Sequence, residues 1–286
     1  MKPAFAKTLR RAKLFIISAL ACAMPAVASA QYSAPSFSER SIGEKYHVEL
    51  SGSFWTPDVF GVISSEQFGI PGDKISLVDD LGFLRTRFRD FKIVLRPGKK
   101  HRFRIQYTPL QYSSETTLKR TIVFNGIAFP CPPAQPCNVV LPIDAQFGWN
   151  VWRFGYEYDF LYKKRGFAGL ILEARETEFS AGLQSPIANE FTSAKGPLPA
   201  LGFIGRGYVM PEVSITAEVT GLMFPKSLLP NIEANYFDWD IYGTFNLSNN
   251  AGIQVGWRRL TTFLDVEHDT ADMKFQGMWW GGTIRF

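Results

Sequence analysis

The chain has 286 residues, of which 46% are hydrophobic and 20% are charged, and its formal net charge is +5 at pH 7. The first thirty residues hold five of the 31 Lys and Arg residues and no acidic residue, so the remainder carries 26 charges of each sign. The basic excess therefore belongs to the amino-terminal segment, and no nucleic-acid partner is expected. Beyond residue 30, no apolar run reaches the 18 or so residues that a membrane helix requires.

Residues 1–30 have the pattern of a cleaved secretory signal peptide. A basic start precedes an apolar run from Leu14 to about Val27 and small residues at 28–30, which predicts cleavage before Gln31. A transmembrane anchor is the alternative, but the apolar run is short and Pro25 interrupts it. Lipid attachment at Cys22 is a second alternative, although Ala19 stands where a larger aliphatic residue is usual. The Ser-rich residues 31–45 are expected to form a flexible periplasmic lead-in.

Once the signal peptide is removed, Cys131 and Cys137 are the only cysteines. In an oxidising compartment we expect them to form a disulfide that closes a small loop and stabilises it by about 2 to 3 kcal/mol. Zinc is the alternative, but the chain has no second cysteine pair and only three histidines. No metal site is expected, and no cofactor.

From residue 46 onward, apolar and aromatic residues alternate with small or charged ones, which is the pattern of β-strands. Residues 146–160 show it clearly, because Trp152, Phe154 and Tyr156 alternate with Arg153 and Glu157. The sequence predicts ten such strands, at residues 46–55, 85–96, 101–113, 146–160, 167–181, 198–210, 213–224, 234–247, 252–264 and 272–286.

The connections between these strands alternate in length. Short turns at residues 97–100, 163–166, 211–212 and 248–251 interleave with longer segments at 56–84, 114–145, 182–197, 225–233 and 265–271. This rhythm is typical of an even-stranded barrel whose termini and short turns lie on one side of a membrane. Residues 119–129 are strand-like and are expected to extend above the membrane. Because this segment makes the strand count uncertain by one hairpin, eight or twelve strands are the alternatives to ten.

The polarity of the two strand faces predicts a transmembrane antiparallel up-and-down β-barrel over residues 46–286. A soluble barrel has an apolar interior, whereas here the apolar face would point outward to lipid and the charged face inward. The residues expected to face the lumen are Arg102, Arg104, Arg153, Glu157, Asp159, Glu173, Arg175, Arg206, Glu218, Asp238, Asp240, Arg258 and Arg285. They would form either an ion-paired plug or a constricted path for a small polar solute.

Aromatic residues near the strand ends are expected to form girdles at the two membrane interfaces. They are Tyr158, Phe160, Phe245, Trp257, Trp280 and Phe286 toward the turns, and Trp55, Tyr112, Trp149 and Trp239 toward the loops. The alternative is that they reflect the general preference of aromatic residues for sheets.

The signal peptide, the alternating strands and the final stretch from Trp280 to Phe286 resemble bacterial outer-membrane β-barrel proteins. The resemblance implies a location in the outer membrane and contact with outer-membrane lipid. It also implies that periplasmic chaperones and the barrel-insertion machinery are partners, with Trp280, Ile284 and Phe286 in the last strand as the assembly signal.

Ten-stranded outer-membrane proteases of the omptin family offer a catalytic alternative. The loop side of this chain supplies Asp79, Asp80, Asp238, Asp240, Asp265, Glu267 and His268, and a histidine beside a carboxylate can activate water. Omptins, however, place the histidine two residues after an aspartate, whereas Asp265 lies three residues before His268 and Glu267 adjoins it. No serine-nucleophile, phosphate-binding or metal motif is present either. We therefore expect no enzyme.

The expected function is that of an integral outer-membrane barrel that is structural or a narrow passive pore for small polar solutes. The alternative is a surface interaction or adhesion protein whose long loops, at residues 56–84 and 114–145, contact an extracellular ligand of unknown identity.

Overall fold

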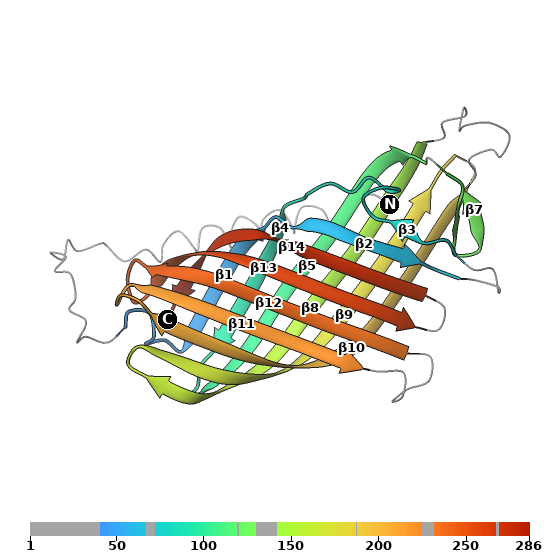
Figure 1. Ribbon diagram of the computed structural model, residues 1–286. Helices are drawn as coiled ribbons and strands as arrows, with labels where there is room; N and C mark the ends of the chain where they lie inside the picture. Colours follow the sequence, from blue (N-terminus) through green and yellow to red (C-terminus); the bar gives the residue numbers. More distant parts are fainter. Residues whose placement is uncertain are drawn as a thin grey trace, which may run out of the picture. The chain divides into compact units, whose positions relative to one another are not determined.

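The computed structural model describes residues 41–66, 72–118, 120–129, 142–186, 188–224, 232–266 and 269–286. Fourteen strands are defined in these ranges (Figure 1). They are β1 (Val48–Trp55), β2 (Asp58–Ser64), β3 (Ile75–Ser76), β4 (Phe88–Leu95), β5 (His101–Thr117), β6 (Ile122–Phe124), β7 (Ile127–Phe129), β8 (Pro142–Lys163), β9 (Gly166–Gln184), β10 (Asn189–Tyr208), β11 (Val213–Phe224), β12 (Ile232–Asn246), β13 (Ala251–Val266) and β14 (Asp269–Arg285). Within the same ranges, no helix is long and apolar enough to cross a membrane.

Ten strands close into an antiparallel barrel, as the sequence predicts. The closed ring runs β1, β4, β5 and β8 to β14, and β1 returns to pair with β14. Glu49 lies opposite Arg285 and Trp55 opposite Trp279 at the two ends of this closing seam. Each strand of the ring therefore has a hydrogen-bonded neighbour on both sides. Strands can lie in lipid only under this condition, because no water is present there to satisfy unpaired backbone groups.

The short turns gather at one end of the ring, called here the short-turn end, and the longer connections at the other, called the long-loop end. Residues 42–47 cross the short-turn end. The backbone N–H of Ile42 donates to Pro211 O at 2.9 Å, and Arg96 N–H donates to His47 O at 2.7 Å. The described part of the predicted lead-in is therefore tied to the turns between strands, and Glu44 within it is buried.

Four strands, β2, β3, β6 and β7, lie where the sequence predicts long connections. β2 continues the path of β1 along β14, with Asp58 opposite Gln276 and Ser64 opposite Thr270, and β3 adds to its edge. The predicted strand-like segment at residues 119–129 forms the β6–β7 hairpin, whose turn residues Asn125 and Gly126 both have positive φ. This hairpin is a separate two-stranded sheet, so the ring has ten strands rather than eight or twelve.

The strands β8, β9 and β10 are longer than the sequence predicts. The segment at residues 182–197 is expected to be a polar loop, yet β9 continues to Gln184 and β10 begins at Asn189, with these two residues opposite one another. The prediction was wrong because it took polar residues as the sign of a loop. Strands that extend beyond the membrane do not need an apolar outer face, so a polar segment can still form a β-ladder. These strands extend past β11 to β14 at the long-loop end, beside the β6–β7 hairpin (Figure 1).

Candidate functional site

The interior of the barrel holds the charged residues that the strand alternation assigns to it. Twelve of the thirteen predicted lumen residues are buried, and Asp240 is half-buried. The neighbouring residues of opposite parity, such as Phe154 and Phe203, are exposed on the outer surface. The period of two along each strand therefore places one polar and one apolar face on opposite sides of the sheet.

Arg153 is the centre of an ion-paired group at mid-height in the lumen. Its guanidinium lies 2.8 Å from Glu173, 3.1 Å from Glu218 and 3.3 Å from Asp238, three carboxylates that come from β9, β11 and β12. Arg258 on β13 also binds Asp238, at 2.7 Å. Such pairing offsets the cost of removing these charges from water.

The same network continues on the other side of Glu218. Arg104 binds Glu218 at 2.5 Å and Glu157 at 3.3 Å, and Arg102 binds Glu157 at 2.7 Å. Charges from β5, β8, β9, β11, β12 and β13 thus cross the lumen in one connected set. We call this set the ionic layer: Arg102, Arg104, Arg153, Glu157, Glu173, Arg175, Glu218, Asp238 and Arg258.

Glu44 closes the ionic layer at the short-turn end. Its carboxylate lies 3.1 Å from Arg206, 3.5 Å from Arg96 and 3.7 Å from Arg102, and it accepts a 2.8 Å hydrogen bond from the Tyr208 hydroxyl. Burial raises the pKa of the Glu44 carboxyl, but Arg206 and Arg102 outweigh burial and hold the pKa below its usual range. Sequence analysis missed this residue, because an aperiodic segment carries no signal for which side chain enters the lumen.

Toward the long-loop end the lumen is filled by apolar side chains instead. Trp149, Phe275 and Tyr112 pack together, with ring centroids 5.5 Å apart for Trp149 and Phe275 and 6.1 Å apart for Tyr112 and Phe275. Leu77 and Phe83, from the segment between β3 and β4, are buried in the same cluster. We call this cluster the apolar layer: Trp55, Val59, Ile63, Leu77, Leu81, Phe83, Phe88, Leu110, Tyr112, Phe147, Trp149, Tyr236, Leu260, Met273 and Phe275 among its buried members.

The apolar layer corrects the predicted loop-side girdle. Trp55, Tyr112 and Trp149 are buried inside the barrel rather than facing lipid. The physical reason is strand parity: Trp149 has the same parity as Arg153 and the opposite parity to the outward Trp152, so an unbroken strand turns it inward. On the turn side, Phe160, Trp280 and Phe286 are exposed on the outer surface, as the girdle requires.

Two cation–aromatic contacts join the layers. The Arg175 guanidinium lies 3.8 Å from the centroid of the Tyr236 ring, and the Arg258 guanidinium lies 4.9 Å from the Trp55 ring. A polar cavity of about 40 Å³ beside Asp90, Asp240 and Arg258 has room for water molecules and not for a larger solute.

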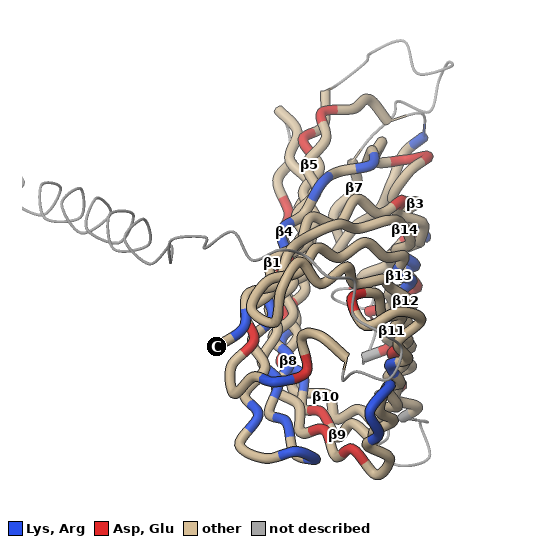
Figure 2. Tube along the Cα trace, turned by 90° about the vertical axis from the view of Figure 1, so that its left-hand side faces the viewer, with Lys and Arg blue, Asp and Glu red and all other residues tan. Residues whose placement is uncertain are grey.

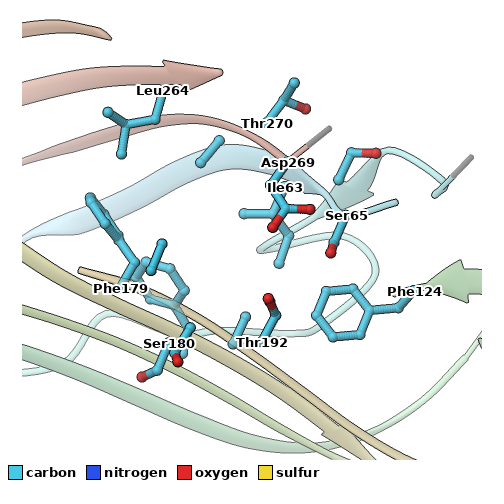
Figure 3. Close-up of a pocket in the computed structure, with 15 residues that line it drawn as sticks. Ile63, Ser65, Phe124, Phe179, Ser180, Thr192, Leu264, Asp269 and Thr270 are labelled. Atoms are coloured by element: carbon cyan, nitrogen blue, oxygen red, sulfur yellow. The ribbon is translucent and has the colours of Figure 1, made fainter. Parts of the chain in front are cut away.

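An apolar cavity of about 90 Å³ lies at the long-loop end, between the upper parts of β9 and β10 and the ends of β13, β14 and β2. Figure 3 shows Phe179 and Leu264 on one side of it and Phe124 and Ile63 on the other. Ser65, Ser180 and Thr192 also line it, and the Thr192 hydroxyl points into it (Figure 3). We call it the rim cavity. No motif predicts it, because its walls come from seven strands that are distant in sequence.

Among the described acidic residues considered for catalysis, Asp79 and Asp80 lie apart from Asp238 and Asp240. Asp80 binds Arg120 at 2.9 Å and accepts a hydrogen bond from the Ser76 backbone N–H, and Asp79 contacts the Ser76 hydroxyl, so both stabilise a turn. Asp238 and Asp240 lie in the lumen, where Asp240 accepts a 2.8 Å hydrogen bond from the Trp279 indole. Glu267 and His268 lie outside the described residues. In the described part of the chain, no group of His, Cys, Asp and Glu side chains is arranged to hold a metal ion.

Two other predictions concern the cysteines and the last strand. Cys131 and Cys137 lie outside the described residues, so their disulfide stays a prediction. Trp280, Ile284 and Phe286 all project from the outer face of β14. Arg285, between the last two, points inward and binds Glu49 at 2.5 Å.

Comparison with solved structures supports the fold. The outer-membrane protease OmpT of Escherichia coli superimposes with a TM-score of 0.51 at 10% sequence identity, covering 88% of this chain and all of OmpT. The attachment invasion locus protein Ail of Yersinia pestis, solved with a heparin analogue, covers 84% of this chain and 99% of Ail at 12% identity, with a TM-score of 0.36. Neisserial surface protein A gives a TM-score of 0.34, also at 12% identity, and covers 84% of this chain and 97% of that protein.

Neither the protein-family models nor the curated protein sequences contain a match. The likeness to OmpT establishes the outer-membrane β-barrel fold and no activity, because the identity is low.

Proposed function

We propose that this outer-membrane barrel is a surface-binding protein that receives an apolar group of an extracellular ligand in the rim cavity. The observation that carries the proposal is the filling of the lumen. The ionic layer and the apolar layer follow one another along the barrel, whereas the rim cavity lies at the long-loop end, which faces outward in barrels of this kind.

The filled lumen favours binding over passage of solutes. A polar solute would have to separate the Arg153 ion pairs and then cross an apolar cluster that contains Trp149 and Phe275. Loss of one partner from a buried ion pair costs about 3 to 5 kcal/mol, because the other charge stays buried without compensation. We therefore prefer the interaction protein to the narrow pore among the two functions that the sequence suggests.

The rim cavity has the chemistry of a small binding site. Its walls contain Phe124, Phe179 and Leu264. Burial of a ring or a short alkyl group against these side chains would lower the free energy by about 25 cal/mol per Å² of apolar surface removed from water. The Thr192 hydroxyl points into the cavity (Figure 3), where it could bind a polar part of the ligand. Stacking of Phe179 on Trp149, at 4.8 Å between centroids, fixes one wall to the apolar layer.

We further propose that the protein acts without catalysis. Asp79 and Asp80 are engaged in a turn and an ion pair, which supports a structural role for them. The described histidines His47 and His101 lie at the short-turn end, where His101 contacts the Tyr156 hydroxyl at 2.7 Å.

A cavity-filling substitution tests the binding site. Ala181→Phe places a ring in the rim cavity, and Ala174→Phe places the same ring on the outer face of the same strand. With the protein held in amphipol and benzene as the probe, saturation-transfer NMR should detect binding to the wild type. We expect Ala181→Phe to weaken it at least about tenfold, because the added ring occupies the space, and Ala174→Phe to leave it unchanged.

A heat-modifiability gel verifies that both variants form a barrel. Equal benzene signals from the wild type and a folded Ala181→Phe variant would show that the cavity does not bind apolar groups. Loss of signal in Ala174→Phe as well would place the benzene on the lipid-facing surface and contradict the proposal.

A further inference from the structure

A basic cleft lies at the short-turn end of the barrel, opposite the end that holds the rim cavity. It has a volume of about 730 Å³ and is lined by Ser41, Lys99, Tyr162, Lys163, Lys164 and Arg165. The turns between β4 and β5 and between β8 and β9 supply its cations. Figure 2, which views the short-turn end, shows Lys and Arg positions gathered below β8.

The carboxylates of this region are already neutralised inside the barrel. Glu44 lies among Arg96, Arg102 and Arg206, and Asp159 lies 2.9 Å from Arg102. Both carboxylates are buried, whereas Lys99, Lys163 and Lys164 are exposed. Among the described residues, the lining of the cleft therefore contains no acidic side chain, and its lysines present positive charge to the outside.

The cleft adjoins the lipid-facing band. Phe160 and Leu161 come directly before its cations on β8, and Phe103 follows Lys99 closely on β5. All three side chains are exposed on the outer face of the barrel. Tyr162 lines the cleft and turns its ring inward, where it packs against Phe167 and lies 5.0 Å from the Arg96 guanidinium. An apolar outer face that ends in basic residues matches a bilayer, in which acyl chains are followed by phosphate groups at the surface.

We propose that the cleft binds the headgroup of an anionic phospholipid from the inner leaflet of the outer membrane. The lipid phosphate would accept hydrogen bonds from the Lys99, Lys163 and Lys164 ammonium groups, while the acyl chains would lie on Phe103, Phe160 and Leu161. This site is independent of the rim cavity and of the proposed function, because it lies at the opposite end of the barrel.

The test compares lipid retention by the mature full-length chain. The protein is equilibrated in nanodiscs with equal amounts of phosphatidylglycerol and phosphatidylcholine, and co-purifying lipid is measured by native mass spectrometry. The wild type should retain phosphatidylglycerol preferentially. Replacing Lys99, Lys163 and Lys164 together by Gln should reduce that preference at least about tenfold, since each cation near a membrane surface adds to the attraction.

The matched control is the triple replacement of Lys74, Lys195 and Lys274 by Gln, which removes the same charge from the other end of the barrel. It should keep the preference, and so should replacing the three cleft lysines by Arg. A heat-modifiability gel confirms folding in each case.

Three results would overturn the proposal. One is equal retention of the two lipids by the wild type. Another is a folded cleft variant that keeps the wild-type preference. The third is displacement of phosphatidylglycerol by millimolar glycerol phosphate or by a soluble peptidoglycan fragment, because the cleft would then be a site for soluble anions or for the cell wall.

Discussion

At the scale of single residues, Glu44 shows how a charge outside the strands completes the lumen. Three arginines and one tyrosine from strands and turns converge on its carboxylate. Without it, Arg102 and Arg206 would be buried with less compensating charge, and leaving a buried charge uncompensated costs about 3 to 5 kcal/mol. Glu44 is thus a link between the amino-terminal segment and the barrel.

Replacing Glu44 by Gln should lower the free energy of unfolding by about 3 kcal/mol at pH 7. The pKa of the Glu44 carboxyl is lower in the folded chain than its ordinary value of 4.5. As pH falls, the unfolded chain takes up the proton first, so the stability that Glu44 provides is full above about pH 4.5 and declines below it. The difference between wild type and Glu44→Gln should therefore shrink from pH 7 to pH 3 in urea unfolding experiments.

The exposed neighbour Lys45 supplies the control, because Lys45→Gln removes a charge that is not buried. It should leave the unfolding free energy within about 0.5 kcal/mol of the wild type. If the unfolding free energies of wild type and Glu44→Gln differed by the same amount at every pH, the lowered pKa of Glu44 would be contradicted.

At the scale of elements, the last strand combines two separate roles on its two faces. Phe286 is 65% exposed on the outer surface, whereas Arg285 is 1% exposed and binds Glu49 and Asn246. The backbone of Phe286 also pairs with Val48. The side chain of Phe286 therefore adds little to the packing of the finished barrel, while Arg285 holds the seam between β1 and β14.

Substitutions at these adjacent positions should affect different steps. Phe286→Ala keeps the backbone pairing, so we expect a several-fold lower outer-membrane yield in cells and a change within about 1 kcal/mol in the unfolding free energy of refolded protein. Arg285→Gln should lower the unfolding free energy by about 3 kcal/mol, because Glu49 loses its partner. Equal yields of Phe286→Ala and wild type would refute the role of Phe286 as assembly signal.

At the scale of the whole molecule, the two layers predict a closed barrel. The purified protein in planar bilayers should give no discrete conductance steps in concentrated potassium chloride, since ions would meet both the ionic layer and the apolar layer. A heat-modifiability gel of the same sample verifies the folded state, and a general porin in the same apparatus verifies sensitivity. Reproducible steps that scale with protein concentration would restore the narrow pore as the function.

The sequence by itself determined the barrel fold, its closure and the inward direction of Arg153 and Glu218, with ten strands expected and eight or twelve left as alternatives. These follow from a local rule, the alternation of side chains along a strand, and from the demand that backbone groups in lipid be paired. Even the inward position of Trp149 follows from its parity with Arg153, although its aromatic character suggested a membrane girdle.

Only the tertiary structure decided what the inward residues meet. Glu44 enters the lumen because the chain crosses the short-turn end, and Leu77 and Phe83 enter because a long connection folds inward over β2. The rim cavity and the basic cleft each depend on residues far apart in sequence. The alternation along a strand determines whether each side chain points inward or outward. Which residues it then contacts depends on how segments that are distant in sequence pack together.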